Sequence, residues 1–284
     1  MHAPTSTRRI LVTGATGTLG RHVIAALEDQ PGVGARILSR RERPAVIATG
    51  REWVRADLAT DSLDAALEDV DGVIHLASDK GSGEADVIGT RRLLAAAEGA
   101  GARHVVVISI IGCDRIPLPF YASKVRIEAL TRASAIPWTI ARVAQFHSFV
   151  ERLVAAPAAL PIPAPIVADL RFQPVDEREV ADRLVEIALG TPLGDAPEIA
   201  GPEVLTLGEI ATTWLAESGR PGTLVPVALD TIAPGSAGLP TIAPWVPGTL
   251  EGYRSGANTP HGDRTLGHVR FVDWLRQRRA AGSA

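Results

Sequence analysis

Cysteine is almost absent from this 284-residue chain, which contains only Cys113. No intrachain disulfide can form, and this favours a reducing compartment. The longest apolar run, residues 105–111, is too short to cross a bilayer, and the first 14 residues lack the apolar core of a signal peptide. The sequence therefore predicts a soluble, cytoplasmic protein with no membrane partner.

Long basic runs are also lacking, and the formal net charge is −3. This net charge gives no electrostatic reason to bind a polyanion, so we expect no nucleic-acid partner. The seven histidines show no metal-ligand spacing with a carboxylate or cysteine, and we expect no metal. The sequence contains neither the G-x-S-x-G motif of hydrolases nor the G-x-x-x-x-G-K-S/T loop of nucleotide triphosphatases.

Aromatic residues make up only 4% of the chain, so Ala and aliphatic side chains must fill the core. Short apolar runs alternate with amphipathic segments along the first half of the chain. This pattern predicts an α/β Rossmann-type fold with a doubly wound parallel sheet. Strands are expected at residues 10–13, 35–39, 52–56, 72–78, 104–109 and 138–142, and helices at 21–29, 62–68 (with Asp61 as cap), 85–98 and 121–134.

We expect residues 1–146 to form a dinucleotide-binding core, and residues 147–284 to complete it and add a small substrate lobe. Residues 157–170 are rich in Pro and Ala and are predicted to be irregular. A short strand is expected at 171–175, and helices at 177–189, at 205–219 with a stop near Gly219, and at 270–280. Residues 230–262 hold many Pro and Gly and give no clear pattern.

A glycine-rich segment, Gly14-Ala15-Thr16-Gly17-Thr18-Leu19-Gly20, lies between the first predicted strand and the first predicted helix. This context is the one in which glycines mark a dinucleotide site. Gly14 permits a tight turn, Gly17 lets the backbone approach a diphosphate, and Gly20 allows the helix to pack closely on the strand. Amides of the helix N-terminus stabilise the phosphate charge.

The end of the second strand distinguishes between the two nicotinamide dinucleotides. An NAD site usually has an Asp or Glu there, which binds the ribose 2′-hydroxyl. This chain has Ser39-Arg40-Arg41 instead. A guanidinium pairs well with a 2′-phosphate, so the sequence favours NADP(H) over NAD(H), with Arg40 as the preferred contact.

Several motifs in this order resemble an atypical short-chain dehydrogenase/reductase, and within that superfamily the NmrA-like group. They are TGATGTLG, Asp57-Leu58, HLAS at 75–78, VISI at 107–110, Lys124, and GPEVLTLGEI at 201–210. The resemblance covers nearly the whole chain and is weakest across residues 230–262.

The resemblance implies roles for the matched positions. Asp57 and Leu58 would flank the adenine, and Ala77 and Ser78 would line the ribose and diphosphate channel. Residues 143–147 would border the nicotinamide and the substrate. The resemblance also implies roles for three single residues. Ser109 would be the catalytic Ser, Lys124 would contact the nicotinamide ribose, and Phe146 would contact the cofactor.

The chain departs from the superfamily at its catalytic pair, Tyr-x-x-x-Lys. The residue four before Lys124 is Phe120, which has no proton to give. Tyr121, three before Lys124, lies on roughly the same helical face if the helix has already begun. Tyr121 therefore replaces the usual acid, or the acid is absent and the chain binds the cofactor with weak or no reductase activity. Gln145, His147 and Gln173 are candidate substrate contacts, and His147 is also a candidate proton donor.

Three functions follow from these residues. The first is an NADP(H)-dependent oxidoreductase that reduces a small carbonyl or quinone-like acceptor, with Tyr121, Lys124 and Ser109 as its catalytic residues. The second is a non-catalytic NADP(H) sensor that acts through a protein partner. The third, a nucleotide-sugar epimerase or dehydratase, is disfavoured by Phe120. The sequence leaves a homodimer open and does not identify the substrate.

Overall fold

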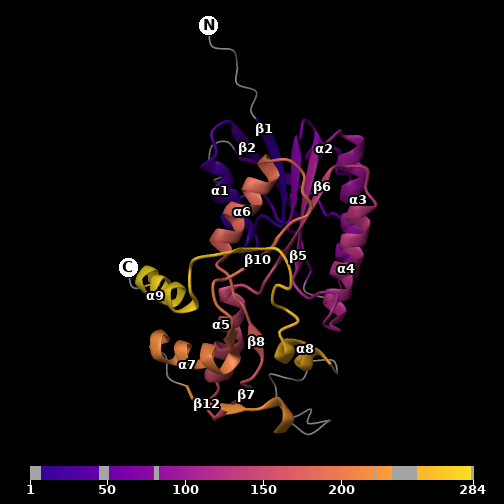
Figure 1. The fold of residues 1–284 in the computed structure, drawn as a ribbon. Helices are drawn as coiled ribbons and strands as arrows, with labels where there is room; N and C mark the ends of the chain where they lie inside the picture. The colour runs from indigo at the N-terminus through magenta and orange to yellow at the C-terminus, as the bar shows by residue number, and fades with distance from the viewer. Residues whose placement is uncertain (1–7, 45–50, 80–82, 220–221, 232–247, 283–284) are drawn as a thin grey trace. The chain divides into compact units, whose positions relative to one another are not determined.

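The computed structural model describes residues 8–44, 51–79, 83–219, 222–231 and 248–282. Figure 1 shows the order of the elements along the chain. They belong to two compact units. The first comprises residues 1–109, 122–142 and 177–196, and the second comprises residues 110–121, 143–176 and 197–284. The two units are interleaved along the sequence.

A parallel sheet forms the centre of the first unit. Its strand order is β6-β5-β4-β1-β2-β3, and β9 adds to β6. The order reverses between β1 and β4, and this switch point is where open α/β sheets bind ligands, beyond the carboxyl ends of the strands. The strands are β1 (Arg8–Thr13), β2 (Val33–Ser39), β3 (Arg51–Arg55), β4 (Gly72–His75), β5 (His104–Ile110), β6 (Trp138–Val143) and β9 (Gly194–Asp195).

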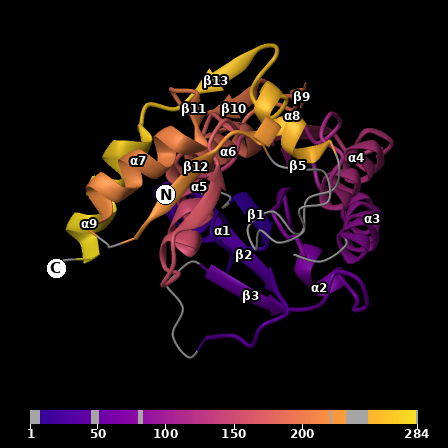
Figure 2. The same cartoon turned by 90° about the horizontal axis from the view of Figure 1, so that it is seen from below.

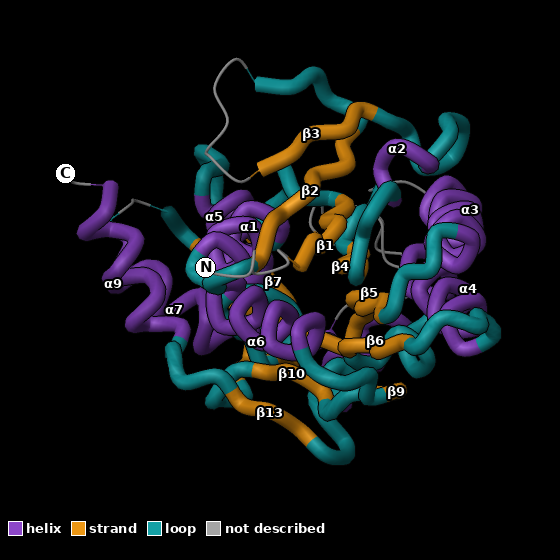
Figure 3. The backbone as a smooth tube through the Cα atoms, turned by 90° about the horizontal axis from the view of Figure 1, so that it is seen from above, coloured by secondary structure: helices purple, strands orange, loops and turns teal. Residues whose placement is uncertain are grey.

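Helices cover both faces of this sheet. Figure 3 shows α1 (Gly20–Glu28) and α6 (Glu177–Leu189) on one face, and α3 (Glu84–Gly99) and α4 (Pro119–Arg132) on the other, with the short α2 (Asp64–Leu67) beside α3. Strands covered on both faces read as continuous apolar runs, and Ile10, Leu11 and Val12 are each fully buried. The α/β Rossmann-type fold predicted from the sequence is therefore confirmed.

The second unit is a smaller collection of helices and short strands around an aromatic core of Trp214, Phe172, Tyr253 and Phe271. Figure 2 shows α7 beside α9, and α7 also packs against α5. Its strands pair as β7 with β12, β8 with β11, and β10 with β13. The elements are α5 (His147–Ala158), β7 (Ala164–Val167), β8 (Arg171–Phe172), β10 (Glu198–Ala200), β11 (Leu205–Thr206), α7 (Leu207–Ser218), β12 (Leu224–Val227), η1 (Leu229–Thr231), α8 (Thr249–Ser255), β13 (Arg264–Leu266) and α9 (Phe271–Gly282).

Three local predictions need correction. Residues 157–170 are not irregular throughout, because α5 runs to Ala158 and residues 164–167 form β7, which pairs with a strand some 60 residues later along the chain. Of the strand expected at residues 171–175, only the first two residues form a strand, β8. Asp61 does not cap α2, because its carboxylate accepts the Asp57 N–H instead. In contrast, Gly219 does end α7, with φ of 64°. Of the unpatterned region 230–262, residues 232–247 lie outside the described residues.

Candidate functional site

The glycine-rich loop joins the buried end of β1 to the start of α1. Gly14 has φ of +69°, and a Cβ there would lie 2.7 Å from both the Ala77 amide nitrogen and the Leu76 carbonyl carbon. A side chain at Gly20 would overlap the Gly14 carbonyl oxygen. Both glycines therefore hold the loop tightly against the end of β4 and against α1, as the sequence predicted.

The tip of this loop is open. Thr16, Gly17 and Thr18 are exposed, whereas Leu19 and Gly20 are buried. Leu19 is the N-cap of α1, and it makes no side-chain capping bond within the part of the chain that the structure describes. Amides at an uncapped helix start are suited to an anion. The loop is therefore suited to a diphosphate, and the roles of Gly14, Thr16, Gly17, Thr18, Leu19 and Gly20 as cofactor contacts stay predictions.

A chain of side-chain hydrogen bonds fixes the loop against β4. Nδ1 of His75 lies 2.7 Å from the Thr13 hydroxyl, and Nε2 lies 2.9 Å from the Thr90 hydroxyl. Thr90 donates its proton to the Asp86 carbonyl, so it must accept from Nε2–H of His75. The Thr13 hydroxyl then donates to Nδ1, and its oxygen accepts the N–H groups of Leu76 and Ala77 at 3.2 Å.

His75 is neutral in this network. Its burial, and secondly the charge of Lys124, lower the pKa of His75 from 6.5 to about 3. A neutral ring is required for Nδ1 to accept the Thr13 proton. The network therefore holds the ends of β1 and β4 together at the point where the sheet order reverses.

Basic side chains gather where β2 and β3 end. Arg40 is 72% exposed and lies 3.9 Å from the Asp57 carboxylate. Arg55 is aligned with Ser39 across the two strands, donates to the Arg40 carbonyl and pairs with Glu42 at 3.0 Å. The structure thus brings together Arg40 and Asp57, the two residues that the sequence assigned to the ribose and adenine end.

The remaining predicted contacts of the first unit lie on loops after the strands. Leu58 packs against Gly89 of α3, and the Ala77 amide lies where a side chain at Gly14 would be. The Ser78 hydroxyl donates to Asp86 at 2.9 Å, which ties the segment after β4 to the first turn of α3. These positions are compatible with the channel that the resemblance implies, and their roles as cofactor contacts remain predictions.

Ser109 lies beside a buried charge cluster. Glu128, 1% exposed, accepts from Arg142 at 2.8 and 2.7 Å, and Arg132 lies 3.2 Å away. Burial raises the pKa of Glu128, but hydrogen bonds from Arg142 and Ser109 outweigh it and bring this pKa below its usual value. The Ser109 hydroxyl thus donates to a structural carboxylate, and its catalytic role stays a prediction. Lys124, on α4, is 5% exposed.

The second unit holds a buried polar cluster around Tyr121, which we call the tyrosine pair cluster: Tyr121, Tyr253, Gln145 and Asn258. The two tyrosine hydroxyls are 2.6 Å apart, and Gln145 donates to the Tyr121 hydroxyl at 3.2 Å. Asn258 donates to the Gln145 amide oxygen at 3.0 Å. Burial raises the pKa of Tyr121, while the bonds from Tyr253 and Gln145 oppose that rise. Tyr121 is thus a protonated phenol at neutral pH.

The other substrate candidates have packing partners. His147 is fully buried, its Nε2 lies 3.0 Å from the Val269 carbonyl oxygen, and its ring contacts those of Phe271 and Trp274. Gln173, 7% exposed, donates to the Gly201 carbonyl at 2.8 Å. Phe146 is half-buried and forms an isolated bridge with Val175. The predicted substrate and cofactor roles of His147, Gln173 and Phe146 stay predictions.

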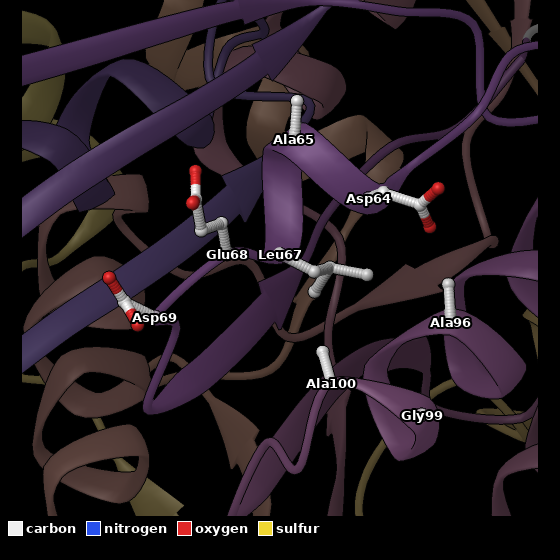
Figure 4. A pocket seen from close by; sticks show the side chains of 8 residues that line it. All are labelled: Asp64, Ala65, Leu67, Glu68, Asp69, Ala96, Gly99 and Ala100. Atoms are coloured by element: carbon white, nitrogen blue, oxygen red, sulfur yellow. The ribbon is translucent and has the colours of Figure 1, made fainter.

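A surface pocket of about 680 Å³ lies elsewhere on the first unit. Figure 4 shows it between α2 and the last turn of α3, lined by Asp64, Glu68 and Asp69 on one side and Ala96, Gly99 and Ala100 on the other. These segments precede β4 and β5, so the pocket lies where the strands begin, not where they end. It is therefore separate from the glycine-rich loop.

Neither a metal cluster nor a membrane-spanning helix is found in the described residues. Among these ranges, no group of three or more His, Cys, Asp or Glu side chains could hold a metal ion. No helix in them is long and apolar enough to cross a membrane.

Sequence reasoning missed four residues that organise these sites: Thr13, Glu128, Tyr253 and Asn258. Thr13 and Glu128 lie in predicted elements, and a buried polar residue there gives no signal until its partner is known. Tyr253 and Asn258 lie in the unpatterned region, and Asn258 is 113 residues from Gln145. One signal was present: the chain has only two tyrosines.

Comparison with known proteins agrees with this geometry. Residues 14–154 match a family model described as NAD(P)H-binding. A (4-alkanoyl-5-oxo-2,5-dihydrofuran-3-yl)methyl phosphate reductase of Streptomyces griseus is 33% identical over 75% of this chain and 74% of its own length. Quinone oxidoreductase 2 of Escherichia coli is 27% identical over 74% of this chain and 75% of its own.

The fold also matches solved structures. The crystal structure of the NADPH-dependent quinone oxidoreductase of E. coli, in complex with NADPH, has a TM-score of 0.76 at 21% identity, and the match covers 95% of this chain and 99% of that one. The chain therefore belongs to the NAD(P)H-binding atypical short-chain dehydrogenase/reductase family, related to quinone oxidoreductase 2 and the NmrA-like reductases. It is an NAD(P)H-binding oxidoreductase of that family.

Proposed function

We propose that this protein is an NADPH-dependent reductase of a small conjugated carbonyl or quinone-like acceptor. The observation that carries the proposal is the glycine-rich loop, held open at the switch point of the sheet by the Thr13–His75 network. The names of two relatives, a reductase of an oxo-dihydrofuran phosphate and a quinone oxidoreductase, support an acceptor in which a carbonyl is conjugated with a double bond.

The preference for NADPH over NADH is argued from the end of β2. The exposed Arg40 guanidinium is available to a 2′-phosphate, and no carboxylate follows β2 directly. Asp57 lies near enough to Arg40 to orient it without neutralising it fully, because the pair is 3.9 Å apart and exposed. A phosphate with two negative charges would compete well for this guanidinium.

The bound dinucleotide supplies the hydride. The chain supplies position and a proton. Lys124 would hold the nicotinamide ribose, and Tyr121, in the first turn of α4, would give its phenolic proton to the acceptor oxygen. Phe120 cannot do so. Because Tyr121 is protonated at neutral pH and is held by Gln145, it is suited to act as an acid.

An assay of NADPH oxidation tests this proposal. The full-length protein is mixed with a panel of quinones, unsaturated lactones and aldehydes, with NADH in parallel. We expect turnover with conjugated acceptors and a preference for NADPH. Tyr121→Phe should lower kcat by roughly 100-fold or more, because general acid catalysis contributes at least this factor. Lys124→Met should chiefly raise the KM for NADPH.

A matched control is Phe120→Leu, which alters the neighbouring ring without removing a proton donor. It should retain most of the wild-type kcat. Absence of turnover with every acceptor, together with tight NADPH binding, would instead favour the sensor function. That second candidate rests on Phe120 in the usual place of the catalytic tyrosine.

A further inference from the structure

The tyrosine pair cluster contains a directed chain of hydrogen bonds. The Arg171 carbonyl can only accept, so the side chain of Asn258 that lies 2.9 Å from it must present its NH₂ group. The same NH₂ group donates to the amide oxygen of Gln145. Gln145 must then present its own NH₂ group to Tyr121. The orientation of both amides follows from one backbone carbonyl.

This chain delivers a donor to the oxygen of Tyr121. The Gln145 NH₂ group donates to that oxygen at 3.2 Å, and the Tyr253 hydroxyl lies 2.6 Å from it. Tyr121 and Tyr253 are 4% and 2% exposed, so the protein itself supplies the neighbouring hydrogen-bond donors of the Tyr121 hydroxyl. A phenolate at Tyr121 would thus receive two donors, one from Gln145 and one from Tyr253.

The orientation of Asn258 leaves one of its own polar atoms without a partner among the described residues. Asn258 is fully buried, and its Oδ1 accepts no hydrogen bond from any described residue. An unsatisfied buried acceptor destabilises a protein. The side chain nevertheless holds the Gln145 amide in the one orientation that donates to Tyr121.

We propose that Tyr253 is a positioning residue that supports the phenolate of Tyr121 when Tyr121 gives up its proton. The inference rests on the proposed function. In the reaction, a carbon of the acceptor gains a hydride from NADPH, and its oxygen takes the proton of Tyr121. The O–H bond of Tyr121 breaks and leaves its electron pair on the phenolate oxygen. Tyr253 donates to that oxygen until solvent returns a proton, and NADP⁺ is left.

The groups around Tyr121 and Tyr253 affect the pKa values of the two hydroxyls differently. Burial raises the pKa of Tyr121, and so does Cys113, while Tyr253 and Gln145 lower it. Burial raises the pKa of Tyr253 well above its ordinary value, and the neighbouring Tyr121 raises it further. Because Gln145 donates to the Tyr121 oxygen, we place the first ionisation on Tyr121, with Tyr253 as a donor to its phenolate.

The tyrosine count makes a direct test possible, since these are the only two tyrosines in the chain. Tyrosinate absorbance of the full-length protein, followed against pH with circular dichroism as a check on folding, reports on this pair alone. We expect the single tyrosine of Tyr253→Phe to ionise about one pH unit above the first step of the wild type. If alkali unfolds the protein, fluorotyrosine labelling lowers the pH at which the two residues ionise. Each labelled residue then also gives its own ¹⁹F signal.

The kinetic readout is the pH profile of kcat with NADPH and the best acceptor. Tyr253→Phe should lower kcat by about tenfold, which corresponds to one pKa unit. It should also move the alkaline limb of the pH profile to higher pH and leave the KM for NADPH unchanged. Phe172→Leu is the matched control, because the Phe172 ring packs 5.2 Å from the ring of Tyr253 but carries no hydroxyl. It should leave the ionisation of Tyr121 in place.

An unchanged or lower ionisation of Tyr121 in Tyr253→Phe overturns the inference, as does the same upward shift in Phe172→Leu. Turnover by the wild type is a separate result. If the expected ionisation shift is seen and no acceptor is reduced, the proposed function fails while the support of Tyr121 by Tyr253 stands.

Discussion

The Thr13 hydroxyl lies 2.7 Å from Nδ1 of His75, and this bond joins the carboxyl ends of β1 and β4. The same hydroxyl accepts the amides of Leu76 and Ala77, the residues that leave no room for a side chain at Gly14. The position of the glycine-rich loop thus depends on an uncharged, buried histidine. We therefore expect this pair to affect both the acid stability of the protein and its affinity for the cofactor.

The acid stability should show the neutral state of His75. In the unfolded chain its pKa is about 6.5, and in the folded protein it is about 3. Between these values the unfolded state binds a proton that the folded state does not, so the free energy of unfolding falls as the pH falls. The slope due to His75 is about 1.4 kcal/mol per pH unit. Urea unfolding at about pH 6, 5 and 4, between the two pKa values, measures it.

His75→Gln provides the comparison for that experiment, because it keeps a hydrogen-bonding side chain that does not titrate. His104, whose pKa is also lowered by burial, is present in both proteins and cancels in the difference. An identical pH dependence of the two proteins would show that His75 is charged or exposed in the folded state.

A negative charge at the tip of the loop should weaken cofactor binding strongly without unfolding the protein. Gly17 is exposed, and its nearest contact for an added Cβ is the Gly14 carbonyl oxygen at 3.2 Å. Gly17→Asp should weaken NADPH binding by roughly 100-fold or more through repulsion of the diphosphate. Gly262→Asp makes the same charge change at a glycine with open space around it. Equal affinity of both variants for NADPH would place the diphosphate elsewhere.

Arg40 should distinguish the two dinucleotides. Removing its guanidinium in Arg40→Ala deletes a charge-assisted pair with the 2′-phosphate, so NADPH affinity should fall roughly 10- to 100-fold while NADH affinity changes little. Arg103→Ala is the control, since Arg103 is also 72% exposed and also pairs with an aspartate, Asp71, but at the opposite end of the strands. A loss that is the same for NADPH and NADH would contradict the assignment.

Ser109→Ala separates a catalytic role from a structural one. Because the Ser109 hydroxyl donates to Glu128, we expect the variant to lose about 1–2 kcal/mol of stability and to retain most of its turnover rate. Glu128→Ala should cost about 3–5 kcal/mol, since it leaves Arg142 without its buried partner. Thermal unfolding and steady-state assays measure the two effects. If Ser109→Ala instead slowed turnover by roughly 100-fold at unchanged stability, the family-implied catalytic role would be supported.

The sequence predicted the fold well where the signals are local. The apolar run before Gly14 and the glycine spacing place β1, the loop and α1 within one or two residues of their observed bounds. α6 was predicted at Glu177–Leu189 and is observed there, because its apolar stripe repeats regularly. The end of α7 at Gly219 was predictable for a different local reason, since a glycine in the left-handed region ends a helix.

Long-range pairing could not be predicted in this way. Strand β7 lies in a segment rich in Pro and Ala, and it is ordered by β12, which follows about 60 residues later. The partners of Tyr121 show the same limit, since Tyr253 lies 132 residues away along the chain. A single sequence identifies Tyr121 as a candidate acid, but the residue that supports it depends on the tertiary fold.

The most direct test of the account is a calorimetric titration of the folded full-length protein with NADPH and, separately, with NADH. We predict saturable binding of one NADPH per chain, at least roughly tenfold tighter than that of NADH. Heats that never saturate with either dinucleotide, on protein whose folding is verified by circular dichroism, would contradict the assignment of the loop after β1 as a diphosphate site.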